Sequence, residues 1–77
     1  MTLFEAQPGK KHLVKKLDME EKIERRLEAL GLTENSMIEL LSRKRGGAMI
    51  VKIRGTRFAL GKEICQAIYL WGDNNEK

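Results

Sequence analysis

The sequence predicts a small, mainly β domain that contains a single short α-helix. One segment near the N-terminus, from Asp18 to Leu32, has the signals of a helix, and most of the chain beyond Leu32 alternates between short apolar segments and glycine-containing turns. The chain has 77 residues, of which 42% are hydrophobic and 34% are charged, a composition typical of one folded domain. We therefore expect one domain over residues 1–71, followed by a polar and frayed tail at residues 72–77.

The helix prediction rests on a start signal, an apolar face and a stop signal. We expect Asp18 to be the N-cap residue and Glu21 to be its capping-box partner three positions later. Three apolar residues follow at helical spacing and share one face, namely Ile23, Leu27 and Leu30. Gly31 suits the left-handed residue that ends a helix, and Leu32 then packs back on the last turn.

Five short segments read as β-strands. We expect them at residues 11–17, 37–43 and 48–54, on a returning strand around Phe58 and Leu60, and at 67–71. The alternation is clearest in 48–54, and the side chains that we expect to point inward are Val14, Ile38, Leu40, Met49, Val51, Ile53, Phe58, Leu60, Ile68 and Leu70. Five short strands that close around a small apolar interior describe an SH3-like barrel, with the short α-helix inserted after the first strand.

Turn residues separate these segments. Pro8–Gly9 fits the centre of a type II turn, and Asn35 in the polar turn 33–36 is able to adopt a left-handed conformation. Gly55–Thr56 suits a two-residue type II′ turn with glycine in the first central position. Residues 61–66 are expected to form a short helical turn.

The charge and the cysteine content narrow the function classes. The net charge is +4 and the basic residues are clustered, so they could bind nucleic acid, an anionic membrane surface or an acidic protein face. The same clusters are equally explained as solvated strand edges and loop tips. Cys65 is the only cysteine, so an intrachain disulfide is excluded. Glu5 and Pro8 interrupt any signal-peptide pattern, and the longest apolar run, Ala67–Trp71, is too short to span a bilayer. We expect a cytoplasmic protein without membrane insertion.

The residues do not point to an enzyme. Residues 55–63 differ from a phosphate-binding loop, because five residues separate the glycines instead of four and Glu63 stands where a Ser or Thr would hold magnesium. His12 and Cys65 are the only members of their types, and Cys65 is expected to fill a small core site beside Ile64 and Ile68. We therefore assign no catalytic and no cofactor-binding residue.

A metal site finds little support in the ligand count. A closed transition-metal site requires three or four convergent ligands, preferably His or Cys, and the chain has one of each. The helix also offers carboxylates that we interpret as a solvated face, at Glu20, Glu21, Glu24 and Glu28. We assign no metal ligand, although weak binding of Fe²⁺ or another divalent metal, and a site between chains through His12 or Cys65, stay open.

The order and spacing of four segments resemble a known family. They are Pro8–Gly9, RRLEALGL at 25–32, IRGTRFALGKEI at 53–64 and QAIYL at 66–70, and together they resemble the FeoA family of bacterial ferrous iron uptake. The same fold occurs as the C-terminal SH3-like domain of metal-dependent repressors of the diphtheria-toxin-repressor type. The chain departs from the family at two turns, where Thr33-Glu34-Asn35-Ser36 replaces a Pro-Gly turn and Gly46-Gly47-Ala48 replaces Gly-Asp-Pro.

The resemblance implies a small cytosolic accessory protein that binds and modulates the FeoB GTPase transporter, and that FeoB recruits to the inner face of the membrane. We expect a monomer or a weak oligomer. The partner-binding surface would be basic and near the two hairpin ends, formed by Arg43, Lys44, Arg45, Arg54 and Arg57. Two alternatives stay open: a stand-alone regulatory domain that binds a metal-dependent regulator or a transition metal, and, less favoured because aromatic residues are few, a basic nucleic-acid-binding barrel.

Overall fold

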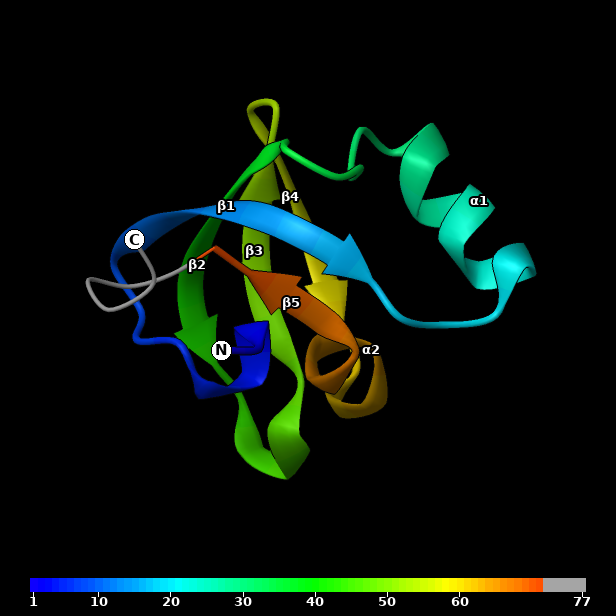
Figure 1. Ribbon diagram of the computed structural model, residues 1–77. Coiled ribbons are helices and arrows are strands. Elements are labelled where there is room, and N and C mark those ends of the chain that lie inside the picture. The colour runs from blue at the N-terminus through cyan, green and yellow to red at the C-terminus, as the bar shows by residue number, and fades with distance from the viewer. Residues whose placement is uncertain (72–77) are drawn as a thin grey trace.

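The computed structural model describes residues 1–71 and confirms a mainly β fold with a short α-helix after the first strand (Figure 1). Five strands form one antiparallel sheet in the order β4-β3-β2-β1-β5. Along the chain, the elements are η1 (Leu3–Glu5), β1 (Lys10–Leu17), α1 (Glu21–Ala29), β2 (Met37–Arg43), η2 (Arg45–Gly47), β3 (Met49–Ile53), β4 (Thr56–Leu60), α2 (Lys62–Gln66) and β5 (Ile68–Leu70). The tail predicted at 72–77 lies outside the described residues.

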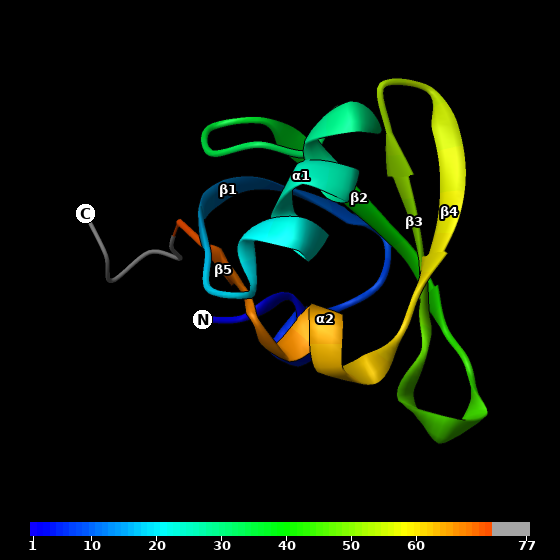
Figure 2. The ribbon, with the colours of Figure 1, turned by 90° about the vertical axis from the view of Figure 1, so that its right-hand side faces the viewer.

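The sheet curls into a barrel (Figures 1 and 2). The register shifts between Val14 and Lys16 of β1 and again between Leu40 and Ser42 of β2, and such irregularities increase strand bending and twist. The N-terminal residues then cover the outer edge of β5, because Thr2 bridges to Tyr69 and the Leu70 N–H donates to the Met1 carbonyl. β4 forms the opposite edge of the five-stranded order.

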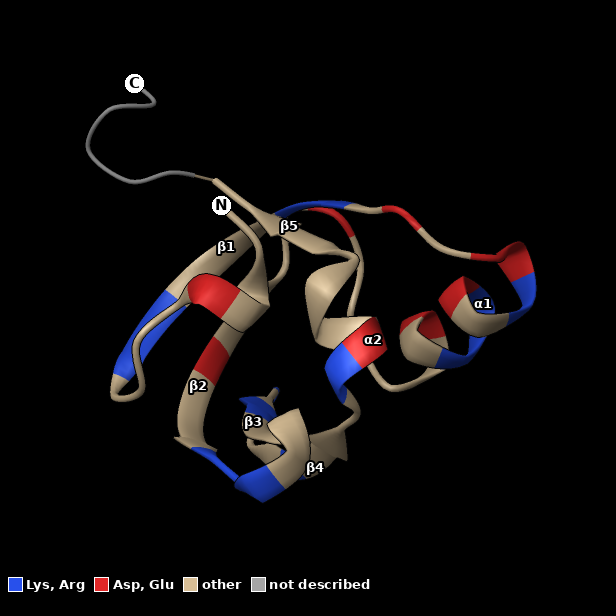
Figure 3. Cartoon of the chain, turned by 90° about the horizontal axis from the view of Figure 1, so that it is seen from below, with Lys and Arg blue, Asp and Glu red and all other residues tan. Residues whose placement is uncertain are grey.

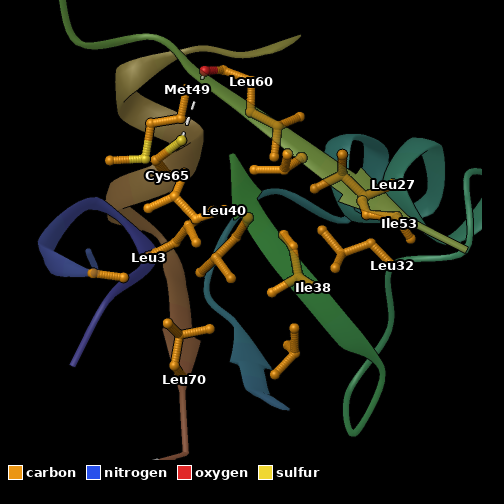
Figure 4. Close-up of a cluster of buried hydrophobic side chains, with 14 of the residues drawn as sticks. Leu3, Leu27, Leu32, Ile38, Leu40, Met49, Ile53, Leu60, Cys65 and Leu70 are labelled. Carbon is orange, nitrogen blue, oxygen red and sulfur yellow. Dashed lines mark hydrogen bonds between the residues drawn. The ribbon is translucent and has the colours of Figure 1, made fainter. Parts of the chain in front are cut away.

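The core confirms the predicted alternation of the strands. Phe58 is partly buried against the core, and every other side chain predicted to point inward is buried. Leu27 of α1, Leu32 just beyond its end and Leu3 near the N-terminus also belong to the core (Figure 4), as does Ala6. Within residues 1–71, no buried residue is polar or charged, so the fold is held mainly by apolar burial.

The start of α1 differs from the prediction. The N-cap residue is Glu20 rather than Asp18, and it makes no side-chain capping bond, so the capping box with Glu21 does not form. Asp18 directly follows β1, and its N–H donates to the carbonyl of Ala67, which is 2.9 Å away and precedes β5. The helix therefore begins only after the chain has left the sheet.

The end of α1 confirms the predicted stop signal. Gly31 has φ +101°, and its N–H donates to the Glu28 carbonyl while the Leu32 N–H donates to the Leu27 carbonyl, both at 2.9 Å. This pair of bonds is a Schellman motif, and the burial of both leucines supplies its hydrophobic contact. Of the three residues predicted on the apolar face, Leu30 is the outlier, because it remains 40% exposed.

The hairpin between β3 and β4 turns one residue earlier than predicted. Ile53 pairs with Thr56, so the two central residues are Arg54 (φ +52°) and Gly55 (φ +84°). Two positive φ angles define a type I′ turn, and the predicted type II′ turn at Gly55–Thr56 is wrong. The predicted left-handed Asn35 is confirmed at φ +68°.

Candidate functional site

The predicted basic residues fall into two groups at opposite ends of β3. Arg43, Lys44 and Arg45 lie at the connection between β2 and β3, and Arg54 and Arg57 lie at the hairpin between β3 and β4. Five residues of β3 separate the groups, a span of roughly 17 Å. The two ends project on the same side of the molecule, the side formed by β3 and β4 (Figure 2). The five side chains therefore do not form one compact patch but mark the two ends of one edge.

Arg43 is held by the fold. Its Nη2 donates to the carbonyl of Ala6, and its guanidinium lies 5.4 Å from the centre of the Phe4 ring. Lys62 approaches the same ring at 5.7 Å, and its side chain packs against Gly47, where a Cβ would come within 2.9 Å of it. Through these contacts with Ala6 and Phe4, Arg43 holds the N-terminal turn against the end of β2. The neighbouring Lys44 and Arg45 are exposed.

The second group extends into a row of charges across the sheet. Arg57 is opposite Lys52, Lys52 is opposite Glu39, and Glu39 is opposite Lys11. A shallow depression of about 200 Å³ opens beside this row, lined by Lys11, Met37, Glu39, Lys52, Arg54 and Gly55. The sequence prediction missed Lys11 and Lys52 as neighbours of this group, because only the register of the strands shows it.

These cations lack ion-pair partners in the described part of the chain. The one salt bridge among residues 1–71 joins Arg25 and Glu21 on the exposed surface of α1, at 2.7 Å. That pair supports the interpretation of the helix carboxylates as a solvated face with i,i+4 pairing. The basic side chains at the hairpin ends and across the sheet are consequently available to an acidic partner.

The fold leaves Cys65 unsuited to nucleophilic chemistry. Cys65 is fully buried in the core as predicted, and its Sγ lies 3.6 Å from the Leu60 carbonyl oxygen (Figure 4). Burial raises the pKa of the thiol to about 11, although the positive charge of Arg43 acts to lower it. A buried thiol of this kind stays protonated at neutral pH. Cys65 is therefore a core residue in this structure.

His12 lies on β1, whereas Cys65 lies on α2. Burial, and then the charge of Lys10, lower the pKa of His12, and its buried Nε2 has no hydrogen-bond partner among residues 1–71. In the same residues, no group of three or more His, Cys, Asp or Glu side chains converges in a way that would hold a metal ion. None of the described helices has the length and apolar character needed to cross a membrane.

Comparison with known proteins identifies similar chains. A sequence model of the FeoA domain matches residues 1–70. The crystal structure of an iron uptake regulatory protein, FeoA, is 28% identical with a TM-score of 0.82, and the match covers 91% of this chain and 93% of that one. The zinc-complexed FeoA of Stenotrophomonas maltophilia, described as a prokaryotic SH3 domain protein, is 25% identical with a TM-score of 0.76, over 91% of this chain and 88% of that one.

The fold also occurs inside larger proteins. A manganese-dependent transcriptional repressor is 24% identical with a TM-score of 0.81, and the match covers 91% of this chain but 40% of the repressor. At this identity, the likeness shows a shared fold, here the SH3-like barrel. A comparison with the sequences of curated proteins gave no match.

Proposed function

The chain belongs to the FeoA family and is an accessory protein of ferrous iron transport, and we propose that it acts by binding the cytosolic GTP-hydrolysing region of the FeoB transporter and modulating its activity. The match over residues 1–70 carries this proposal. The protein works in the cytoplasm and is recruited to the inner face of the membrane through FeoB. A rigid barrel with exposed loops suits a binding module.

We assign the contact with FeoB to the edge formed by β3 and β4. β4 is the last strand of the sheet, and both basic hairpin ends project beside it (Figure 2). An acidic face of the partner that lies along this edge reaches both groups, with Lys44 and Arg45 at one end and Arg54 and Arg57 at the other. Arg43 acts as a positioning residue, because its bond to Ala6 fixes the base of the first group.

Titration calorimetry against the soluble G-protein region of FeoB from the same organism, with and without nucleotide, tests the proposal. We expect saturable binding, and we expect a lower affinity in each of two double charge reversals, Lys44→Glu with Arg45→Glu and Arg54→Glu with Arg57→Glu. Lys22→Glu with Arg26→Glu is the matched control, since it makes the same charge change at two exposed residues of α1. No binding in any nucleotide state would overturn the FeoB assignment, and normal binding by both folded double variants would overturn the β3–β4 edge.

A further inference from the structure

Exposed hydrophobic side chains gather on the outer face of β5, β1 and β2. Within residues 1–71, the exposed large hydrophobics include Leu13 at 38%, Met37 at 52% and Trp71 at 45%. Each is next to a buried residue in the sequence: Leu13 precedes Val14, and Met37 precedes Ile38. Trp71, just after β5, follows the buried Leu70. Since side chains alternate along a strand, all three of the exposed residues point outward from the barrel.

The three residues are neighbours across the strands. Leu13 of β1 is directly opposite Met37 of β2, and the N–H of Trp71, just after β5, donates to the Leu13 carbonyl at 2.9 Å. The Trp71 indole is also fixed at its edge, where Nε1 donates to the Oδ1 of Asn35 at 3.4 Å. Trp71, Leu13 and Met37 therefore form a continuous apolar row across β5, β1 and β2.

Basic side chains surround the apolar row. The ammonium of Lys15 lies 5.0 Å from the centre of the Trp71 ring, and that of Lys16 lies 5.1 Å from the centre of the Tyr69 ring. On the other side of the row, the depression of about 200 Å³ beside Met37 is lined by three cations, Lys11, Lys52 and Arg54, and by the carboxylate of Glu39. Figure 3 shows the two basic stretches of β1, whereas many of the acidic residues lie on and before α1. This face is therefore predominantly cationic.

We propose that this outer face of β5, β1 and β2 docks on the surface of an anionic phospholipid bilayer. Tryptophan with aliphatic neighbours and long-stemmed lysines is the composition that settles at a bilayer interface, with the rings and methylene stems among the acyl boundary and the ammonium groups at the phosphates. The cations of the depression beside Met37 face the lipid phosphates in this arrangement. The proposal does not depend on FeoB as a partner.

The same residues suit nucleic acid less well. Bases stack on open aromatic faces, and in this structure Lys15 lies over Trp71 and Lys16 over Tyr69. The rest of the apolar row is aliphatic, which supplies buried area in a bilayer interface but no stacking platform. The observations thus favour a lipid surface, and binding to an acidic protein segment or to an oligonucleotide becomes an outcome of the test.

Trp71 supplies the probe, because it is the only tryptophan of the chain. We would record its fluorescence, and vesicle co-sedimentation, with vesicles of phosphatidylcholine alone and with added phosphatidylglycerol. We expect a blue shift, quenching by brominated lipid and co-sedimentation only when the anionic lipid is present, all weakening at high salt because charge attraction is screened. No blue shift on anionic vesicles at low salt, or a shift caused by an oligonucleotide or an acidic peptide but not by vesicles, would overturn the proposal.

Matched variants test the assigned face. Lys11→Gln is expected to weaken vesicle binding about fivefold, and Leu13→Ser combined with Met37→Ser to abolish the blue shift. Leu30→Ser is the control, because Leu30 is an equally exposed leucine, at 40%, next to α1. Thermal unfolding of each variant confirms that it folds. The assignment of this face is refuted if the Leu13 and Met37 changes leave vesicle binding intact. It is also refuted if Leu30→Ser reduces vesicle binding as much as they do.

Discussion

Replacing Gly31 by alanine tests how the end of α1 is fixed to the barrel. Gly31 ends the helix with φ +101°, and its N–H and that of Leu32 donate the two hydrogen bonds that close the last turn. It also lies under the side chain of Arg54, from the hairpin between β3 and β4. The substitution therefore perturbs the backbone conformation and one tertiary contact at once.

The expected loss has two sources of unequal size. A residue with a Cβ in the left-handed region costs about 1–2 kcal/mol. The new Cβ would also lie 2.9 Å from the Cδ of Arg54, closer than such atoms approach, and 3.1 Å from its Nε, which is a tight contact. Because the Arg54 side chain is exposed, it is free to move aside into another staggered rotamer, which makes this the smaller source. We expect Gly31→Ala to lower the free energy of unfolding by about 1–2 kcal/mol in total.

Urea unfolding followed by circular dichroism measures this loss, and two variants divide it. Gly46→Ala is the control for backbone strain alone, since Gly46 has φ +86° and nothing lies within 4 Å of the added Cβ. Arg54→Ala in the Gly31→Ala background removes the crowding and leaves the strain, so it should recover only the smaller part of the loss. Unchanged stability of Gly31→Ala, or full recovery in the double variant, would refute the assignment of the main cost to the left-handed backbone.

Four further predictions concern single residues. Arg43→Ala should lower the free energy of unfolding by about 1–2 kcal/mol, because it removes the hydrogen bond to Ala6 and the contact with the Phe4 ring. Arg45→Ala should change it by less than about 0.5 kcal/mol, and urea unfolding compares the two variants. Arg54→Asn should raise stability by about 0.5–1 kcal/mol in the same assay, since asparagine adopts the left-handed conformation of the turn more readily. Because burial lowers the pKa of His12, an NMR titration should give a value below 6.5, and the wild type should lose stability relative to His12→Gln as the pH falls through that pKa. Burial raises the pKa of Cys65 from 9.0 to about 11, so the neutral thiol should stabilise the fold fully below pH 9. As the pH rises toward 11, the free energy of unfolding should fall by about 3 kcal/mol relative to Cys65→Ala.

The features that the sequence predicted well are those encoded over a few residues. Burial alternates along 49–53 because successive side chains of a strand point to opposite faces, and this period is visible in Met49, Val51 and Ile53 themselves. The left-handed residues at Gly31 and Asn35 were predictable for a similar reason, since local sterics select glycine and asparagine there. Neither inference requires knowledge of a distant segment.

The predictions that failed depend on pairings between distant segments. Asp18 has the chemistry of an N-cap, but its N–H is bonded to Ala67 beside the end of the sheet, and that contact joins residues far apart in the chain. The hairpin turn is set by the pairing of Ile53 with Thr56, which fixes the turn type more strongly than the position of its glycine.

Arg54 shows how one residue connects these observations. In the described residues, it and Asn35 are the two non-glycine residues with positive φ, and asparagine tolerates that conformation far better than arginine does. Turns of this type favour Asn or Gly at its position, so an arginine there carries a conformational cost. Its side chain lies over Gly31 at the end of α1 and also borders the depression beside Met37. Arg54 thus links the helix to the hairpin and faces both proposed contact surfaces. We expect such a strained residue where a side chain serves binding at the expense of stability.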